Sequence, residues 1–598
     1  MIVQKLEHGL LGLVLILMTV LPVGEMVVRT AFGGGIPGSL TLTQQGTLWL
    51  AFLGAAVAAD QDRLLAFDLL KQLLKGQAEQ RLALVRNASG AAICLWLAYA
   101  AWGLVESEMG STETVGLGIP SWAAQAVMPV GFGLLALRQW LLAGDSWRVR
   151  AVVLPVILAV GLVPIIGSLA SDGWYYLALV FMAGAMLAGA PIFTVIGGIA
   201  VVFFMRDDVP AAAVAAETYR IVASPTLPTI PLFTLAGMLL SAGASSQRLV
   251  RLFRAWFGWM PGGVAVAAVV ICAFFTSFTG ASGVTILAMG GLLLPMLMDN
   301  GYSRKRSLGL ITGTGSIGLM FPPSLPLILY AVIAGQAINQ MFVAALLPGT
   351  LMTLMGVAWA VYIGVEAKAP KLPFALREAF AATKASLWEV LFPVWILVGI
   401  FGGFLTVVEA AALSVVYAFV VEFLIYRDLS VGTDLLKVLV DTGVMVGGVL
   451  IIVGAAFGLT SYLVDAMIPE QIIEWIQANI ESRWVLLLLL NLVLLVVGAL
   501  MDIFSAIVVV APLLVPVAQA YDIHPFHLGA IFLSNLEVGY LTPPIGLNLF
   551  LSSYRFNEPL GKVFVAALPV FLISVVAVLV ITYVPELSTW LPAQIFGP

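Results

Sequence analysis

Residues 313–324 read GTGSIGLMFPPS, and residues 534–545, which lie 221 positions further on, read SNLEVGYLTPPI. In this register both stretches carry a glycine at the sixth place, Gly318 and Gly539, and a proline pair near the end. Proline lacks a backbone N–H and disfavours helical geometry in the residue before it. Each stretch therefore predicts a helix that breaks, and the same break occurs twice in one chain.

The same offset relates the two proline pairs and further residues upstream of these stretches. The pairs are Gly237 and Gly458, Pro295 and Pro516, Pro322 and Pro543, Pro323 and Pro544, and Trp174 and Trp395. Matching prolines and glycines in one gapless register indicate that the C-terminal two-thirds of the chain is an internal duplication.

The amino-acid composition indicates whether the protein is surrounded by water or by lipid. The chain has 598 residues, of which 61% are apolar and 10% are charged, whereas soluble proteins carry about 25% charged residues. We predict an all-α polytopic membrane protein. Two cysteines and three histidines disfavour disulfide scaffolds, cysteine-rich metal sites and a haem bound by paired histidines. The net charge of −5 disfavours nucleic-acid binding, and no P-loop motif is present.

Five apolar windows in the N-terminal part are long enough to cross a bilayer as helices. They lie near residues 9–28, 44–60, 87–107, 121–142 and 151–170. The first window is too long for a signal peptide, so we expect it to be retained. Basic residues follow the second and fourth windows, and residues 108–119 contain none, which predicts a cytoplasmic N-terminus. Residues 61–78 are predicted to form an amphipathic interfacial helix, either a connector or a docking arm.

Charge also indicates how the two repeats are oriented. Arg304, Lys305 and Arg306 correspond to the uncharged or weakly basic residues 525–527, and the arginines of segment 248–254 correspond to a segment with two glutamates. Because basic loops prefer the cytoplasm, equivalent loops of opposite character are expected on opposite faces of the membrane. This is typical of an inverted-repeat secondary transporter, in which the binding sites lie between the repeats.

Each repeat also contains an interrupted apolar stretch, residues 279–295 and residues 498–516. We predict two re-entrant helical hairpins there, because exposed backbone at membrane depth is tolerated only beside a polar cavity. Carbonyls freed by the proline pairs are suitable ligands for Na⁺, and the N-termini of half-helices attract anions. The alternative is that these glycines and prolines only kink buried helices.

Three carboxylates lie within apolar sequence. Asp502 is predicted to be an ion ligand, an N-cap of the second hairpin, or both. Glu409 is either a functional carboxylate or one that braces a helix. Glu537 is either a functional carboxylate or a protonated, hydrogen-bonded group of the core. No intramembrane Lys or Arg is evident near the hairpins, so an anionic substrate would rely on Na⁺, backbone N–H groups and polar side chains. The candidates for substrate contact are Ser282, Thr285, Ser316 and Asn548.

These motifs resemble the tripartite ATP-independent periplasmic (TRAP) transporters, with the small and large membrane subunits fused. The large-subunit motifs are Gly301-Tyr302, FPPS at 321–324, VEAAA at 408–412, Met501-Asp502 and LTPPIGLN at 541–548. The weaker small-subunit motifs are WLAFLGA at 49–55, FDLL at 67–70 and LGIPSW at 117–122.

The resemblance implies a multi-pass protein of the bacterial inner membrane that imports an organic acid with Na⁺ by an elevator motion. It also implies a periplasmic substrate-binding protein as the partner. One Na⁺ site would consist of Thr279, Ser282, Gly318 and Phe321, and the other of Asp502, Gly539 and Thr542. Pro322, Pro323, Pro543, Pro544 and Glu409 would be structural or hinge residues. The first hairpin departs from the serine-rich family pattern at Thr279 and Ala281.

The predicted domains follow from the repeat and the resemblance. They are a four-span small subunit at 1–150, a fusion helix at 151–172, a first repeat at 173–386 and a second repeat at 387–598. The alternatives are a carboxylate carrier of elevator type that needs no binding protein, and a passive anion channel. An enzyme is not expected, because no catalytic constellation is evident. Which organic acid is carried, the Na⁺ stoichiometry and the choice between monomer and homodimer stay open at this stage.

Overall fold

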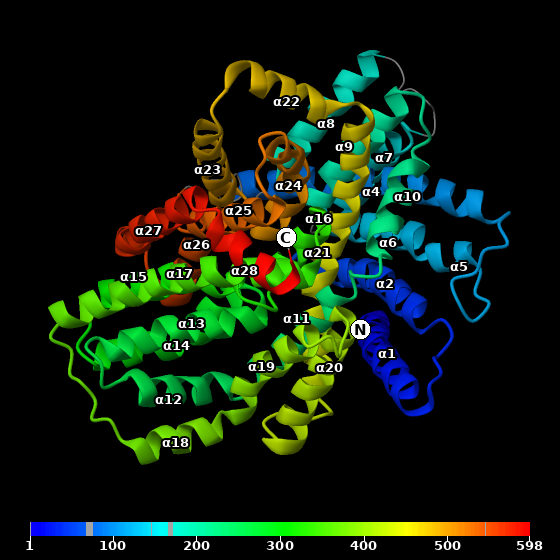
Figure 1. Cartoon of the computed structure of the whole chain (residues 1–598). Helices are drawn as coiled ribbons and strands as arrows, with labels where there is room; N and C mark the ends of the chain where they lie inside the picture. Colours follow the sequence, from blue (N-terminus) through cyan, green and yellow to red (C-terminus); the bar gives the residue numbers. More distant parts are fainter. Residues whose placement is uncertain (1, 67–75, 145, 165–171, 544–545, 598) are drawn as a thin grey trace. The chain divides into compact units, whose positions relative to one another are not determined.

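The computed structural model describes residues 2–66, 76–144, 146–164, 172–543 and 546–597. The described residues are helical with connecting turns, and their only extended pairings are two isolated bridges, Ala66 with Pro191 and Thr114 with Pro120. The chain divides into two compact units. The N-terminal unit comprises residues 1–231 and 436–471, and the hairpin unit comprises residues 232–435 and 472–598 (Figure 1).

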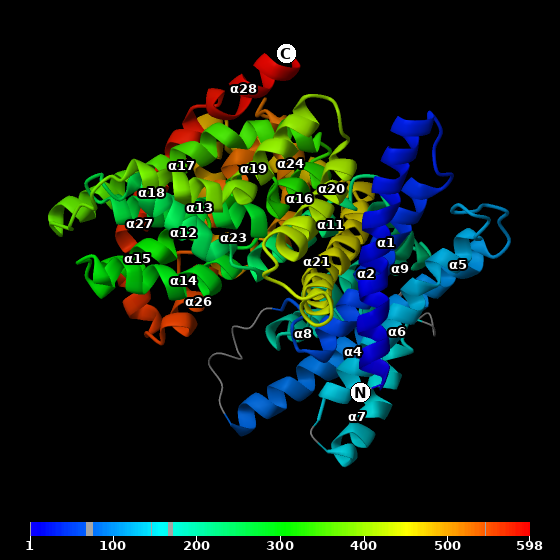
Figure 2. The same cartoon turned by 90° about the horizontal axis from the view of Figure 1, so that it is seen from below.

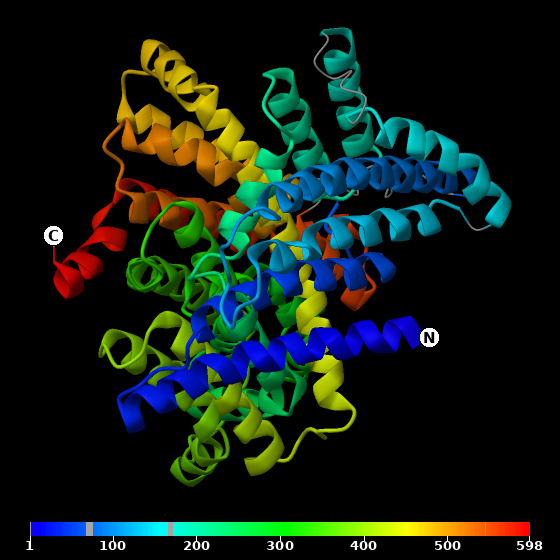
Figure 3. The same cartoon turned by 90° about the vertical axis from the view of Figure 1, so that its right-hand side faces the viewer.

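Among the described residues, the N-terminal unit contains nine whole helices and most of a tenth, α21. They are α1 (Ile2–Phe32), α2 (Ser39–Asp60), α4 (Gln77–Glu108), α5 (Ser121–Gln125), α6 (Val127–Leu142), α7 (Trp147–Gly161), α8 (Asp172–Leu187), α9 (Ile192–Arg206), α10 (Ala212–Val222) and α21 (Asp434–Asp465). Helix α1 packs along α2, and α4 packs along α6; Figure 2 shows α1 beside α2, and Figure 3 shows the blue and cyan helices as long rods. Of these helices, α1, α4 and α21 are long and apolar enough to cross a membrane, and α8 and α9 are shorter apolar helices.

Small residues let α2 and α21 approach closely. A side chain at Gly54 would place its Cβ 2.1 Å from the carbonyl oxygen of Gly443 and 3.0 Å from Cα of Gly447. Backbones in van der Waals contact supply the packing that apolar burial cannot supply in lipid. Two residues along α2 from Gly54, the carbonyl of Ala56 accepts a hydrogen bond from Arg138 of α6. Arg138 also pairs with Glu7 of α1, so this charge inside the unit is paired.

The predicted windows can be compared with these helices. Residues 9–28 lie in α1, 44–60 in α2 and 87–107 in α4, while 121–142 are covered by α5 and α6, which meet at Ala126. Residues 151–161 lie in α7, and 165–170 lie outside the described residues.

The interfacial helix predicted for residues 61–78 does not begin at residue 61. Asp62 adopts a left-handed conformation with φ 50°, and the N–H of Arg63 bonds the carbonyl of Ala58 at 2.9 Å. This pattern closes the C-terminus of α2, as expected for a helix that ends in a left-handed residue. Residues 61–66 are therefore not helical, and 67–75, including the FDLL motif, lie outside the described residues.

The hairpin unit contains the repeat. Its helices are most of α11 (Thr229–Ala242), then α12 (Ser245–Phe257), α13 (Gly263–Thr279), α14 (Ser282–Asp299), α15 (Arg304–Thr314), η2 (Ile317–Met320), α16 (Leu325–Ile333), α17 (Ile338–Glu366), α18 (Leu376–Ala385), α19 (Leu387–Phe401), α20 (Val407–Phe419), η3 (Val420–Ile425), most of α22 (Ile468–Asn479), α23 (Arg483–Leu500), α24 (Ile503–Gln519), α25 (Pro525–Gly539), α26 (Leu547–Phe556), α27 (Leu560–Tyr583) and α28 (Glu586–Phe596).

The register of 221 residues holds in these elements. Helices α14 and α24 begin at Ser282 and Ile503, and α15 and α25 begin at Arg304 and Pro525, each 221 residues apart. The pairs α13 and α23, α16 and α26, and α17 and α27 start within one residue of the same offset. The duplication seen in the sequence is therefore a duplication of structure.

Apolar burial holds the first repeat together. Helix α13 contacts α12, α14, α15 and α17, and Figure 1 shows α15, α13, α14, α12 and α18 in succession on its left. A cluster of buried side chains that includes Val269, Ile271 and Leu293 fills this part of the unit. Among the described residues, eight helices are long and apolar enough to cross a membrane, or up to eleven if three bent pairs each form one span. The prediction of an all-α polytopic membrane protein is confirmed.

Candidate functional site: two hairpin tips and two broken helices

The first hairpin consists of α13 and α14. Helix α13 ends at Thr279, and Gly280 follows with φ +64°, a conformation that glycine adopts without strain. A side chain at Gly280 would also approach Cβ of Leu325 to 3.0 Å. Ala281 is extended and α14 starts at Ser282. The tip is thus the two residues Gly280 and Ala281, with Thr279 and Ser282 on either side.

Thr276, one turn before the tip, is the polar centre of this hairpin. Its hydroxyl lies 2.7 Å from the carbonyl of Cys272, 2.9 Å from the carbonyl of Gly315 and 2.6 Å from the hydroxyl of Thr285. It therefore joins both arms of the hairpin to the end of α15. Sequence reasoning selected Thr285 but missed Thr276, and a threonine among apolar residues gives no separate signal.

The first proline pair ends a broken helix, as predicted. Helix α15 ends at Thr314, the short η2 follows, Phe321 is extended, and α16 starts at Leu325. Gly318 lies directly against α13, because a Cβ there would fall 2.1 Å from the carbonyl oxygen of Ala273. The structure thus brings Gly318 next to the last turns before Thr279. The hydroxyl of Ser324 donates to the carbonyl of Leu319, which satisfies one of the carbonyls freed by the break.

A hydrogen bond between the repeats completes this region. The amide nitrogen of Asn548, in α26, donates to the hydroxyl of Ser316 at 3.2 Å and to the carbonyl of Thr312 at 3.3 Å. The Thr312 hydroxyl bonds the Ser552 hydroxyl at 2.8 Å. Within the part of the chain that the structure describes, the buried oxygens Asn548 Oδ1 and Ser282 Oγ have no partner. Buried polar atoms are rarely left in this state, so these two are available to a ligand.

The second hairpin consists of α23 and α24, with Met501 and Asp502 between them. Asp502 is the N-cap of α24: its Oδ1 accepts from the N–H of Phe504 at 3.0 Å and of Ser505 at 3.1 Å, and its Oδ2 accepts from the Ser505 hydroxyl. A carboxylate has about four lone-pair directions, so these three bonds leave capacity for a cation. The N-cap role that the sequence offered for Asp502 is observed.

Two contacts hold the second hairpin against its broken helix. The Tyr540 hydroxyl accepts from the N–H of Ile503 at 2.6 Å. Gly539 touches Gly498, because a Cβ at Gly539 would lie 2.6 Å from Cα of Gly498. The second hairpin and the end of α25 therefore pack directly together, with Gly498 against Gly539 and Ile503 against Tyr540. Sequence reasoning did not select Tyr540.

The end of α25 is closed by local hydrogen bonds. The N–H of Thr542 bonds the carbonyl of Gly539 at 2.9 Å, and its hydroxyl lies 3.3 Å from the carbonyl of Val538. The N–H of Gly546 reaches the carbonyl of Ala499 at 3.3 Å, so the start of α26 lies at the second hairpin. Pro544, predicted as a structural residue, lies outside the described residues. Pro543 lies in the bend between Thr542 and this gap.

The other two carboxylates differ in their surroundings. Glu409 forms a capping box with Thr406 at the start of α20, and its Oε2 accepts from the Thr406 N–H at 2.8 Å. This geometry is that of a helix brace. Glu537 is 2% exposed, and neither of its carboxyl oxygens has a hydrogen-bond partner among the described residues.

One arginine of the second repeat lies against an arm of the first hairpin. The guanidinium of Arg555, in the last turn of α26, lies against α14, where a Cβ on Gly291 would fall 2.1 Å from its Nη2. The sequence hides this contact because the two residues are far apart in the chain. Arg555 meets the middle of α14, well away from Ser282 at the tip.

A buried ionic cluster at the elbow of α11 and α12 was also missed. Arg248 pairs with Glu389 of α19, with Glu422 of η3 at 3.3 Å and with Asp428 at 2.6 Å, and it stacks on the Tyr426 ring at 3.7 Å. Glu389 and Glu422 are fully buried, with side-chain exposures of 1% and 0%. Partial desolvation opposes ionisation of Asp428, but the hydrogen bonds from Arg248 and the N–H of Ala244 lower its pKa.

The repeated hairpins, broken helices and polar contacts at their ends define a multi-pass membrane transporter. The family profile described as "Tripartite ATP-independent periplasmic transporter, DctM component" matches residues 175–587. The profile described as "Tripartite ATP-independent periplasmic transporters, DctQ component" matches residues 18–149. The chain belongs to the TRAP transporters and carries both membrane components.

Three relatives illustrate the family. The C4-dicarboxylate TRAP transporter large permease protein DctM of Vibrio cholerae is 35% identical over 445 residues, covering 71% of this chain and 98% of that protein. The isethionate TRAP transporter permease protein DctMQ of Oleidesulfovibrio alaskensis is 28% identical over 555 residues, covering 90% of this chain and 86% of that protein. The ectoine TRAP transporter large permease protein TeaC of Halomonas elongata is 29% identical over 367 residues, covering 61% and 86%.

Family membership confirms three predictions. The chain is a transporter rather than an enzyme, it is a multi-pass protein of the bacterial inner membrane, and it is a fused small and large permease. The predicted domain boundaries, the residues of the Na⁺ and substrate sites, and Na⁺ itself stay predictions.

Proposed function

We propose that this protein imports a small organic anion, a carboxylate or a sulfonate, together with Na⁺, and receives the anion from a periplasmic binding protein. The relatives named for C4-dicarboxylate and isethionate support the substrate class, and the relative named for ectoine widens it. The observation that carries the proposal is the bond from Asn548 to Ser316, which joins the two repeats in a region where the buried oxygens of Asn548 and of Ser282, at the first tip, have no partner among the described residues.

The two hairpin tips differ in a way that supports a different ligand at each. The second tip holds the carboxylate of Asp502, whereas the equivalent residue of the first tip is Ala281, which offers no side-chain cap to α14. Free N–H groups at a helix start carry partial positive charge and favour anions. We assign the anion to Ser282, Thr285, Ser316 and Asn548, and one Na⁺ to Asp502, Gly539 and Thr542. A second Na⁺ would bind between Thr279, Ser282, Gly318 and Phe321.

The sequence of events follows from differential affinity. A cation beside Asp502 orders the second tip, and a cation at the first tip adds positive field next to Ser282. The anion then binds more tightly to the Na⁺-loaded state, which is what coupling requires. The two hairpins and the two broken helices move across the membrane together, as an elevator.

Replacement of Na⁺ by K⁺ is expected to reduce uptake at least about tenfold, which corresponds to a coupling free energy of about 1.4 kcal/mol. The measurement is uptake of a labelled organic acid into proteoliposomes that contain the full chain, with its binding protein outside. Equal uptake in both salts would contradict the coupling. Full uptake without the binding protein would favour the carrier that works alone, and flux that follows only the anion gradient would favour a passive channel.

The elevator motion is expected to change the side from which the first hairpin tip can be labelled. The new thiol of the variant Ala281→Cys should react with a membrane-impermeant maleimide from both sides, and Na⁺ with substrate should shift the two rates in opposite directions. The native thiols Cys94 and Cys272 are buried, so their background is low. Ala375→Cys, at an exposed loop position, is the control and should react from one side only. If the thiol of Ala281→Cys reacted from one side in every condition, the motion would be contradicted.

A further inference from the structure

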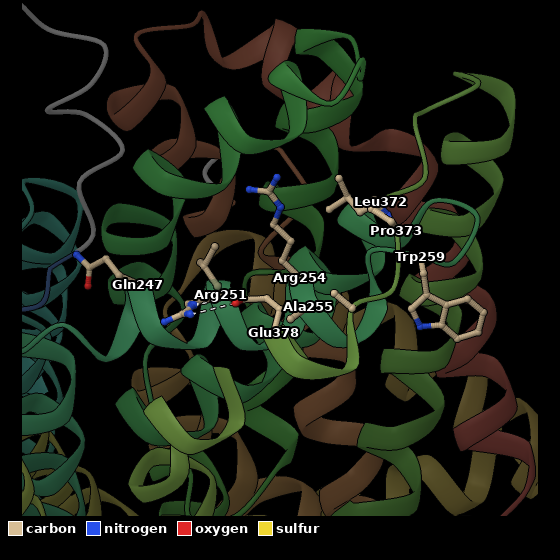
Figure 4. A pocket seen from close by; sticks show the side chains of 10 residues that line it. Gln247, Arg251, Arg254, Ala255, Trp259, Leu372, Pro373 and Glu378 are labelled. Carbon is tan, nitrogen blue, oxygen red and sulfur yellow. Dashed lines mark hydrogen bonds and ion pairs between the residues drawn. The ribbon is translucent and has the colours of Figure 1, made fainter. Parts of the chain in front are cut away.

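A pocket of about 390 Å³ lies between α12 and α18, away from the hairpin tips. Its walls include Gln247, Arg251 and Arg254 of α12, Trp259, Leu372, and Glu378 of α18 (Figure 4). Helix α12 packs against α18 within the hairpin unit. The volume is within the range of sites that hold small ligands, about 300–1,000 Å³.

The two arginines of the pocket are in different states. Arg251 is paired with Glu378 through contacts of 2.8 and 3.2 Å. Arg254 is exposed and forms no hydrogen bond or ion pair through its guanidinium with any residue that the structure describes. Figure 4 shows the dashed line from Arg251 to Glu378, while the side chain of Arg254 extends away from this pair. One positive charge in the pocket is therefore uncompensated.

Exposed aromatic rings adjoin the same pocket. Trp256, Trp259 and Phe374 are 39%, 50% and 46% exposed, and the Phe374 ring lies 6.3 Å from the Trp256 ring and 6.2 Å from the Trp259 ring. Indole rings that expose apolar faces and keep their N–H groups bonded are typical of the membrane–water interface. Here the indole N–H of Trp256 donates to the hydroxyl of Thr383 at 2.9 Å. The indole N–H of Trp259 donates to the backbone carbonyl of Trp256 at 2.8 Å.

The charge of the surrounding segments is strongly positive. Residues 245–257 contain three arginines and no acidic residue, and residues 368–384 contain four basic residues and one glutamate. Segments of this kind lie on the cytoplasmic side. Basic pockets between membrane helices on that side bind anionic lipid headgroups, and basic clusters are drawn to the anionic leaflet.

We propose that the pocket between α12 and α18 binds the phosphate headgroup of an anionic phospholipid of the cytoplasmic leaflet. Arg254 binds the phosphate, Gln247 supplies an amide donor at the pocket edge, and Trp256, Trp259 and Phe374 lie along the acyl chains. The pocket combines a free cation with an apolar border open to lipid, which a free phosphate would not use. This site is independent of the transport site, since none of its residues lies at a hairpin tip.

The test is native mass spectrometry of the full chain in neutral phosphatidylcholine micelles, titrated with phosphatidylglycerol. Arg254→Gln is expected to weaken retention of phosphatidylglycerol about fivefold, the effect of one basic residue near an anionic surface. Arg254→Lys keeps the charge and should retain most of the binding. Arg377→Gln is the matched control: it removes one exposed positive charge from α18 without touching the pocket.

Each outcome has a definite meaning. Loss in Arg254→Gln with unchanged binding in Arg377→Gln supports the site. Equal loss in both variants would mean a diffuse positive field, and no loss in either would mean no headgroup contact, so both results overturn the proposal. Competition by millimolar inorganic phosphate would reassign the pocket to free phosphate. Unchanged thermal midpoints verify folding, because Arg254 is exposed and substitution there is expected to be nearly neutral.

Discussion

Asp502→Asn is expected to lower Na⁺-dependent uptake about tenfold or more while the second hairpin stays folded. Asparagine caps helices as well as aspartate does, so the bonds to the N–H groups of Phe504 and Ser505 can persist. The variant loses the negative charge, and a hydrogen-bonded or ion-bound charge contributes about 1.5–3 kcal/mol. The measurement is the initial rate of uptake as a function of Na⁺ concentration, in which the half-saturating concentration should rise.

The choice of asparagine separates the two roles of this residue. Asp502→Ala removes charge and cap together, and the lost cap alone would cost about 0.5–2 kcal/mol of stability. If Asp502 were only a cap, Asp502→Asn would transport normally and Asp502→Ala would be destabilised. Asp299→Asn, at the exposed end of α14, removes an equal charge away from both tips and should leave the Na⁺ dependence unchanged.

Arg248→Met is expected to destabilise the protein by about 3–5 kcal/mol, because it leaves the buried carboxylates Glu389 and Glu422 without their cation. One oxygen of Glu422 already lacks a hydrogen-bond partner among the described residues. The loss of Arg248 would leave its other oxygen without its ion pair as well. The measurement is the thermal unfolding midpoint of the purified protein in detergent, which should fall clearly below that of the wild type.

A variant one helical turn away gives the control. Arg251 is also ion-paired, with Glu378, but both side chains are about half exposed, and exposed pairs contribute about 0–1 kcal/mol. Arg251→Met should therefore leave the midpoint nearly unchanged. Adding Glu389→Gln and Glu422→Gln to Arg248→Met should recover much of the lost stability. An unchanged midpoint in Arg248→Met would show that the cluster does not fix the elbow of α11 and α12.

The regular parts of this fold could be predicted because they depend on local chemistry. Proline pairs and glycines act on their own backbone, so the breaks at Phe321 and Thr542 and the hairpin tips at Gly280 and Met501 were accessible from the sequence. The duplication strengthened each of them, because a feature that recurs 221 residues later is not accidental.

The missed residues depend on contacts between distant segments. Thr276 bonds the carbonyl of Gly315, Tyr540 bonds the N–H of Ile503, and Arg555 lies against Gly291. No local sequence pattern contains these pairings. The prediction that a helix begins at residue 61 was wrong for a different reason. The left-handed Asp62 ends α2 there, and a periodic pattern of apolar residues does not show where such a stop falls.

The close contact of Gly54 with Gly443 and Gly447 has a further meaning for assembly. Gly54 belongs to the DctQ component and the two other glycines to the DctM component. Where such components are separate chains, their association depends on how much of each is made. Here one polypeptide fixes their ratio at one to one and gives the contact a high effective concentration. A modest glycine interface can therefore keep the two components together without the affinity that free subunits would need.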